Sequence, residues 1–187
     1  MKKIICFGDS LTARREGHET SLLTKLIQQK RPEDCLINAG VSGDNTRQAI
    51  QRLEEDVLNY QPDLVFVLFG SNDAAMHKQV PIEEYHRNLE WITDQIGPDK
   101  VILVTPPPVD ENLQKSRSNQ TLELYGTAVK EVAQLNQTKL LPFYDLLKDL
   151  DYPDILKGVK NDGLHFGEKG YKLLAEWMLE EIKQTFD

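Results

Sequence analysis

The feature that most constrains the fold is the run at residues 64–69 (LVFVLF), which is apolar at every position. A strand with one face in water alternates apolar and polar side chains, whereas a strand covered on both faces is apolar throughout. Pro62-Asp63 precedes the run and Gly70 follows it, which limits it to the length of a strand. We therefore expect residues 64–69 to form a central strand of a parallel sheet with helices on both faces.

Segments typical of strands and of helices alternate along the rest of the chain. Further short apolar runs lie at residues 4–7, 35–39, 101–104 and 140–143. Apolar residues at helical spacing occur at residues 22–27, 50–57, 82–96, 122–132 and 171–182. The alternation predicts a three-layer α/β/α sandwich around a flavodoxin-like, five-stranded parallel sheet of order 2-1-3-4-5. Because no repeat, linker or low-complexity segment interrupts the pattern, we expect residues 1–187 to form a single domain.

Composition and charge argue against several classes of partner. The net charge of −8 leaves no basic footprint for nucleic acid, and no apolar stretch has the length needed for membrane insertion. Cys6 and Cys35 each lie in an apolar run without metal-ligand spacing, so we expect buried thiols in a reducing, cytoplasmic protein. The apolar start of the chain breaks at Gly8-Asp9, which is too early for a signal peptide. We expect no metal and no cofactor.

Small polar residues follow the first three predicted strands. Ser10 comes after the first, Ser42-Gly43-Asp44-Asn45 after the second and Ser71-Asn72-Asp73 after the third. The carboxyl ends of parallel strands share one edge of the sheet, and ligands of open α/β folds bind there. We therefore expect the functional site at this edge.

Ser10, Asp162 and His165 are the candidate catalytic residues. A serine hydroxyl at the end of the first strand can act as a nucleophile, and an aspartate three residues before a histidine can orient its ring as a general base. Each residue also has a structural interpretation when it is taken alone: Ser10 as a helix N-cap, Asp162 in a turn and His165 near a helix start. The chemical interpretation depends on the three residues being read together.

An oxyanion hole is expected beside the nucleophile. The side-chain amide of Asn72 and the backbone N–H groups of Ser10 and Gly43 are the candidate donors. Taken alone, Asn72 and Gly43 are each consistent with a simple turn. We expect Asp9 and Asp73 to support the site through hydrogen bonds.

Four blocks of the chain together resemble the conserved blocks of the SGNH (GDSL-type) esterase/lipase superfamily. The blocks are Phe7-Gly8-Asp9-Ser10-Leu11-Thr12, Ser42-Gly43-Asp44-Asn45-Thr46, Gly70-Ser71-Asn72-Asp73 and Asp162-Gly163-Leu164-His165. The resemblance implies a carboxylic ester hydrolase that works through an acyl-enzyme. It implies Ser10 as nucleophile, His165 as general base and later acid, and Asp162 as its orienting partner. It also implies an oxyanion hole made of Ser10, Gly43 and Asn72.

A narrower resemblance concerns residues 81–85, 88–89, 101–108 and 162–166, which are similar to the isoamyl-acetate-hydrolysing esterase branch. This resemblance implies short-chain acyl or acetyl esters as substrates. The branch usually has a Gly-Trp pair shortly after the nucleophile, whereas this chain has Gly17-His18. We expect the pocket wall or the leaving-group side to differ accordingly.

Other functions stay open at this stage. A lysophospholipase or thioesterase would use the same residues on longer acyl chains. A metal-dependent phosphoester hydrolase would hold Mg²⁺ on Asp9, Asp44 and Asp73, which all follow predicted strands. A receiver domain would need a lysine after the fifth strand, where Phe143-Tyr144-Asp145 stands. We favour hydrolysis of a small-molecule ester in an open, shallow cleft.

Overall fold

In the computed structural model, which describes residues 1–150 and 152–187, one parallel sheet has the order β2-β1-β3-β4-β5. Its strands are β1 (Lys3–Gly8), β2 (Cys35–Gly40), β3 (Leu64–Leu68), β4 (Val101–Val104) and β5 (Lys139–Leu141). β3 is buried at every position and lies between β1 and β4. The predicted sheet order and the predicted central strand are both confirmed.

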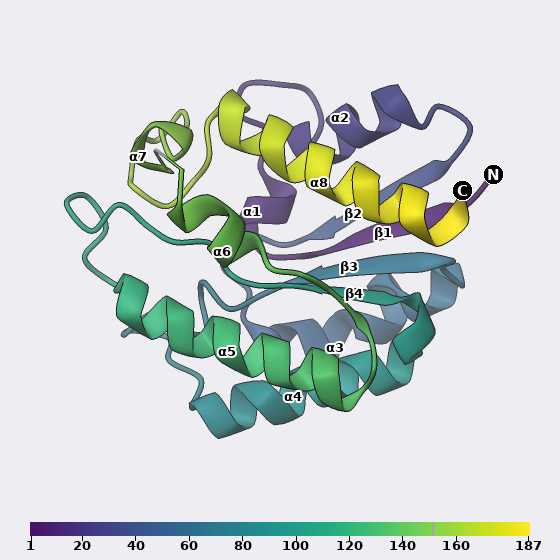
Figure 1. Cartoon of the computed structure of the whole chain (residues 1–187), viewed down its shortest axis with the longest axis horizontal. Coiled ribbons are helices and arrows are strands. Elements are labelled where there is room, and N and C mark those ends of the chain that lie inside the picture. Colours follow the sequence, from purple (N-terminus) through teal and green to yellow (C-terminus); the bar gives the residue numbers. More distant parts are fainter. Residues whose placement is uncertain (151) are drawn as a thin grey trace.

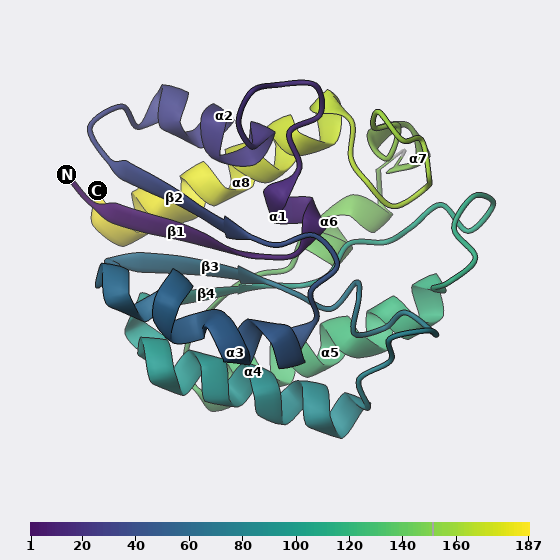
Figure 2. The ribbon, with the colours of Figure 1, turned by 180° about the vertical axis from the view of Figure 1, so that it is seen from behind.

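Helices cover both faces of the sheet (Figures 1 and 2). One face carries α3 (Thr46–Asp56), α4 (Ile82–Ile96) and α5 (Asn119–Leu135). The other face carries α2 (Leu22–Lys30), α6 (Phe143–Lys148) and α8 (Glu168–Phe186). The short elements are α1 (Ser10–Ala13), α7 (Tyr152–Ile155) and the 3₁₀ turns η1 (Leu58–Tyr60) and η2 (Pro98–Lys100).

The sheet divides the core into two apolar clusters. Val65 and Val67 of β3 point into the cluster beneath α3, α4 and α5, whereas Leu64, Phe66 and Leu68 point into the cluster beneath α2 and α8. Full burial of one such side chain contributes roughly 1.5–3 kcal/mol. The unbroken apolar run therefore stabilises both layers and holds β3 in the middle of the sheet.

The fifth strand is shorter than the sequence pattern suggests. β5 ends at Leu141, and Phe143 is the first residue of α6. Pro142 lacks the N–H that a strand would need to continue its ladder. The Phe143 ring instead packs edge-on against Phe166 and Trp177, with ring centroids 5.5 and 5.7 Å away.

The strand register brings the ends of the first three strands together. Gly8 at the end of β1 is paired with Gly40 of β2 and with Leu68 of β3. The two termini lie close together at the opposite end of the sheet (Figure 2). The loops that follow β1, β2 and β3 therefore leave the sheet side by side, where the sequence places the functional site.

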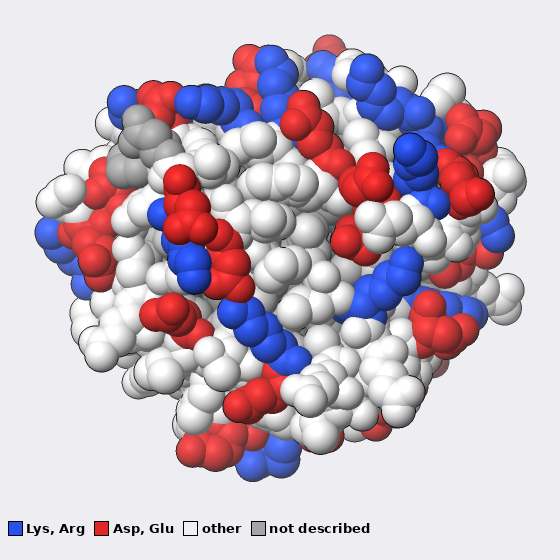
Figure 3. Space-filling model, viewed as in Figure 1, with Lys and Arg blue, Asp and Glu red and all other residues white. Residues whose placement is uncertain are grey.

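The surface carries charges of both signs. On the face seen in Figure 3, acidic and basic groups are interspersed around an uncharged middle. Among the helices of the described residues, none combines the length and apolar character required to cross a bilayer.

Candidate active site

Three side chains from the two ends of the chain meet at the carboxyl edge of the sheet. Ser10 Oγ lies 2.9 Å from His165 Nε2, and His165 Nδ1 lies 2.7 Å from Asp162 Oδ2. Both distances are within hydrogen-bond reach. The structure thus joins the predicted nucleophile, base and orienting carboxylate in one continuous chain of hydrogen bonds.

Ser10 is the first residue of α1, and the N-cap of this helix is Asp9. The Asp9 side chain accepts a 2.8 Å hydrogen bond from the Leu11 N–H. Asp9 rather than Ser10 therefore caps the helix, and the Ser10 hydroxyl is free to face His165. The turn depends on Gly8, because a Cβ there would lie 2.2 Å from Thr12 Oγ1.

The loop that carries Asp162 and His165 is held from several sides. Asp162 Oδ1 accepts hydrogen bonds from the backbone N–H groups of Leu164 (3.1 Å) and His165 (3.0 Å). Glu16, which follows α1, accepts a 2.7 Å hydrogen bond from the Val159 N–H. The loop after Ser10 and the loop that leads to Asp162 and His165 are thereby tied together.

The surroundings of the pair set its protonation. Burial favours protonation of the Asp162 carboxyl, but hydrogen bonds from the His165 backbone and ring outweigh it and lower the pKa of Asp162 to about 2. Burial also lowers the pKa of His165 below its ordinary 6.5, an effect that the Asp162 charge partly offsets. Near pH 7 the arrangement therefore favours a neutral imidazole beside an ionised carboxylate, which is the state a general base needs.

The two predicted backbone oxyanion donors belong to the segments that follow β1 and β2. Within the described residues, the N–H groups of Ser10 and Gly43 donate to no protein acceptor. Gly43 adopts φ +92°, a conformation that favours glycine, and its carbonyl accepts a 2.7 Å hydrogen bond from Lys78 Nζ. The loop after β2 thus presents a free N–H at Gly43, and the peptide that follows it is held by Lys78.

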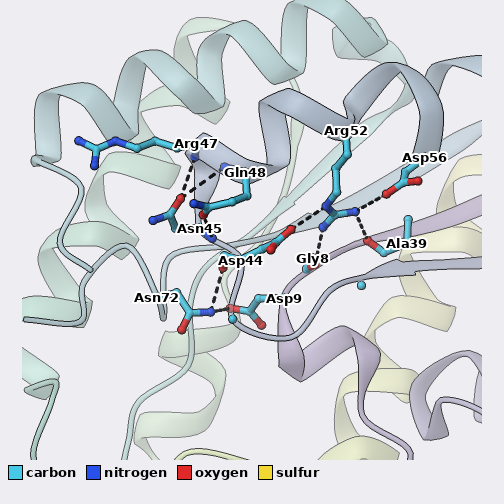
Figure 4. Close-up of polar contacts among 12 residues, drawn as sticks. Gly8, Asp9, Ala39, Asp44, Asn45, Arg47, Gln48, Arg52, Asp56 and Asn72 are labelled. Carbon is cyan, nitrogen blue, oxygen red and sulfur yellow. Dashed lines mark hydrogen bonds and ion pairs between the residues drawn. The ribbon is translucent and has the colours of Figure 1, made fainter. Parts of the chain in front are cut away.

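Asn72 lies in the loop after β3 and contacts the loops that follow β1 and β2 (Figure 4). Its Nδ2 donates a 2.8 Å hydrogen bond to the Asp44 carbonyl and makes a longer, 3.3 Å contact with Asp9 Oδ2. The residue is 6 % exposed. The longer contact is the weaker one, so that N–H is the one a developing oxyanion can capture most readily.

The carboxylates considered for a metal each have protein donors of their own. Asp44 pairs with Arg52 at 2.7 Å, Asp9 caps α1, and Asp73 Oδ1 accepts hydrogen bonds from the Thr46 N–H (2.9 Å) and hydroxyl (2.6 Å). Across residues 1–150 and 152–187, no group of three or more His, Cys, Asp or Glu side chains is arranged to hold a metal ion. Asp9 instead braces the turn at Ser10, and Asp73 braces the start of α3.

Burial raises the pKa of Asp73 to about 6, against hydrogen bonds from Thr46 that lower it. Because the folded state holds this proton more tightly than the unfolded state, stability from this group is present below about pH 4 and is lost towards pH 6. Asp73→Asn keeps an acceptor for Thr46 and cannot ionise. We expect the free energy of unfolding of the variant, relative to that of wild type, to increase by about 1–3 kcal/mol as the pH rises from 4 to 7.

Urea unfolding of both proteins across this range measures the effect. A difference between variant and wild type that stays constant from pH 4 to 7 would contradict the raised pKa.

Two arginines at the site were not identified from the sequence. Arg52 of α3 donates hydrogen bonds to the carbonyls of Gly8 (3.0 Å) and Ala39 (2.8 Å) as well as to Asp44, and so ties the end of β1 to the end of β2 and its following loop (Figure 4). Its position beside Leu53 in the buried stripe of α3 is a signal that could have marked it. Arg117 lies in the loop before α5 and contacts Ser71 and Asn72, and no periodic pattern marks it.

His18, which replaces the tryptophan usual in the resembling branch, is held against α2. Its Nδ1 lies 3.2 Å from Lys25 Nζ. Gly17 before it has φ +85°. The pair therefore forms a tight turn in the loop between α1 and α2.

A comparison with protein families gives one match over most of the chain. The model of the GDSL-like lipase/acylhydrolase family matches residues 6–173. This range includes Ser10, Gly43, Asn72, Asp162 and His165.

Individual relatives agree with this match. The crystal structure of a lipase/acylhydrolase from Enterococcus faecalis superimposes with a TM-score of 0.91 at 32 % identity, covering 98 % of this chain and 96 % of the other. An acetylxylan esterase of Geobacillus stearothermophilus is 29 % identical over 97 % of this chain and 94 % of its own length. The mouse isoamyl acetate-hydrolyzing esterase 1 homolog is 29 % identical over 92 % of this chain and 78 % of its own.

The acetylxylan esterase has also been solved in mutant forms. A serine-to-alanine and a histidine-to-alanine form are both described as catalytic mutants, with TM-scores of 0.74 and 0.75 to this chain at 27 % and 28 % identity. Each covers 97 % of this chain and 94 % of the relative.

Proposed function

Since this chain belongs to the GDSL-like lipase/acylhydrolase family, we propose that it hydrolyses short-chain acyl or acetyl esters through an acyl-enzyme on Ser10. Family and relatives make it a carboxylic ester hydrolase. The proposal adds the mechanism, the site residues and the class of substrate.

One observation carries the mechanism: the hydrogen-bonded series from Ser10 Oγ through His165 to Asp162, with links of 2.9 and 2.7 Å. A serine hydroxyl is a weak nucleophile until an adjacent base takes its proton. The ionised Asp162 fixes the histidine tautomer with a proton on Nδ1, so Nε2 is the basic nitrogen facing Ser10. The catalytic serine and histidine mutants of the acetylxylan esterase are in keeping with this assignment.

In acylation, Ser10 Oγ bonds to the ester carbonyl carbon while its proton passes to His165 Nε2. The carbonyl electron pair moves onto oxygen, where the N–H groups of Ser10, Gly43 and Asn72 would stabilise the charge. When the carbon–oxygen bond to the leaving group breaks, the departing alcohol takes the proton from Nε2. The Asp162 carboxylate stays ionised and stabilises the imidazolium between the two transfers.

Deacylation repeats these steps with water as the nucleophile. His165 Nε2 removes one water proton as the water oxygen attacks the acyl carbon, and the same nitrogen returns the proton to Ser10 Oγ as the acid departs. The protein ends in its starting protonation state. The cycle uses only this chain's own residues and water.

The surroundings of Gly43 favour a small, polar ester over one with a long acyl chain. A pocket that adjoins this glycine is lined mostly by polar and charged side chains. Its lining residues are Gly43, Asn45, Arg47, Gln48, Met76, His77, Lys78 and Gln79. Such a lining suits the hydroxyl groups of a sugar or small alcohol better than a long acyl chain, which requires apolar walls. We therefore place lysophospholipase and long-chain thioesterase activity second.

A series of p-nitrophenyl esters from acetate to palmitate tests the proposal. We expect kcat/KM to be highest for acetate to butyrate and to fall by at least about tenfold by octanoate, because a longer acyl chain would desolvate polar walls without gaining apolar contacts. Activity should survive EDTA. A maximum at long chains would replace the substrate class while keeping the mechanism, and loss of activity in EDTA would favour metal-dependent hydrolysis.

A further inference from the structure

Asn72 is the only side chain among the proposed oxyanion donors, so its amide must be held the right way round. A carboxamide has an oxygen at one end and an NH₂ group at the other, and only the NH₂ group can stabilise an oxyanion. Backbone donors such as the Gly43 N–H are fixed by the path of the chain. Some feature of the protein must therefore select one of the two orientations of the Asn72 amide.

The contacts of Asn72 show what selects it. Arg117 Nη2 donates a 3.1 Å hydrogen bond to Asn72 Oδ1, while Nδ2 faces the Asp44 carbonyl at 2.8 Å and Asp9 Oδ2 at 3.3 Å. Turning the amide over would set its NH₂ group against the guanidinium and its oxygen against two acceptors. Donor would face donor and acceptor would face acceptor, so the observed orientation is strongly favoured.

Arg117 is itself held in place. Its Nε donates to the Ser71 carbonyl, and the neighbouring Ser116 carbonyl accepts a 3.0 Å hydrogen bond from the Met76 N–H. Ser118, which directly follows Arg117, is the N-cap of α5 and accepts a hydrogen bond from the Thr121 N–H. The guanidinium is half-buried and projects from a braced loop onto the block that carries Asn72.

We propose that Arg117 is a positioning residue, which orients the Asn72 amide and strengthens its N–H groups as donors to the oxyanion. A hydrogen bond from a charged donor draws electron density towards the amide oxygen and leaves the NH₂ group more acidic. Burial raises the pKa of the Asp9 carboxyl to about 7, and the positive charge of Arg117 offsets the negative charge of this group when it is ionised. This inference rests on the proposed ester hydrolysis.

Kinetics of Arg117→Met test the inference. The variant keeps an apolar stem and loses the guanidinium, so we expect kcat to fall about 10- to 100-fold, a part of the 10²–10³ that one lost oxyanion donor costs. KM should stay within about twofold, because the contact stabilises the transition state rather than the bound substrate. Arg117→Lys should regain part of kcat, and added guanidinium ion should partly rescue Arg117→Ala.

A double-mutant cycle separates positioning from general damage. In an Asn72→Ala background, Arg117→Met should cause little further loss of kcat, because the amide it positions is gone. Arg31→Met is the matched control: Arg31 bonds Asp34 and Asp187 far from the site, so its loss should lower stability and leave kcat unchanged. Equal losses of kcat in both backgrounds, or an unchanged kcat in Arg117→Met, would overturn the inference.

A measurement that does not depend on catalytic turnover distinguishes this inference from the proposed function. The NMR order parameter of the Asn72 side-chain amide, assigned from its disappearance in Asn72→Ala, should fall in Arg117→Met. An amide that stays equally rigid would overturn the positioning role. If wild type hydrolyses no ester, the proposed function fails and the catalytic part of the inference fails with it, while the amide measurement still reports on the orientation.

Discussion

Ser10→Ala is expected to lower kcat/KM for p-nitrophenyl acetate by about 10⁴-fold or more. In the proposed mechanism, the hydroxyl that His165 contacts at 2.9 Å bonds to the substrate, and alanine offers no replacement. Only stabilisation by the oxyanion donors and binding would remain. Initial rates at substrate concentrations below KM measure the loss directly.

A hydroxyl removed elsewhere provides the control. Ser21→Ala also deletes a serine hydroxyl, one that donates to the Thr12 carbonyl rather than to a histidine. We expect kcat/KM of this variant to stay within about threefold of wild type, since loss of a hydrogen bond of this kind costs about 1 kcal/mol of stability. Retention of more than a tenth of wild-type activity in Ser10→Ala would exclude Ser10 as the nucleophile.

Asp162→Asn is the second large effect, with an expected fall of about 10³–10⁴ in kcat. Asparagine can still accept the backbone hydrogen bonds of Leu164 and His165, so the loop should keep its shape. Its NH₂ group, however, would face His165 Nδ1 and force the ring proton onto Nε2. The nitrogen that faces Ser10 could then no longer accept the hydroxyl proton.

The pH profile gives this variant a second signature. In wild type we expect kcat/KM to fall below an inflection under pH 6.5, because burial lowers the pKa of the His165 imidazole. The Asp162 carboxylate raises the pKa of His165 by stabilising the imidazolium and so partly offsets the effect of burial. Without this charge the inflection should move to lower pH in Asp162→Asn. Asp154→Asn, in which exposed contacts with Lys157 and Lys169 are lost, should show neither change. An unshifted inflection would contradict the role of Asp162.

Much of the fold could be predicted because its signals are local. The unbroken apolar run at residues 64–69 requires cover on both faces, which only a central position provides. The predicted end of β5 at Phe143 is wrong, because the strand ends at Leu141 and Phe143 begins α6. An apolar residue such as Phe143 fits a buried strand and a buried helix equally well, and only the missing N–H of Pro142 favours the end of the strand. Burial by distant partners such as Phe166 cannot be read from a short window.

The candidate site, like the fold, was predictable only where its signals are local in the sequence. The positions of Ser10 and Asn72 after strands, together with the four-block resemblance, predict that these residues lie near His165. Asp9 rather than Ser10 caps α1, a distinction that depends on which side chain reaches the Leu11 N–H. Arg117 could not be predicted, because its role depends on a contact with Asn72 across 45 residues of chain.

Trapping of the covalent intermediate tests the central claim most directly. The protein would be incubated with an organophosphonate that mimics the tetrahedral intermediate, digested and analysed by mass spectrometry beside Ser10→Ala. We predict one phosphonyl group, on the peptide that contains Ser10, with loss of esterase activity in proportion to labelling and no label in the variant. Label on another residue, or full activity with no label on Ser10, would contradict an acyl-enzyme on this serine.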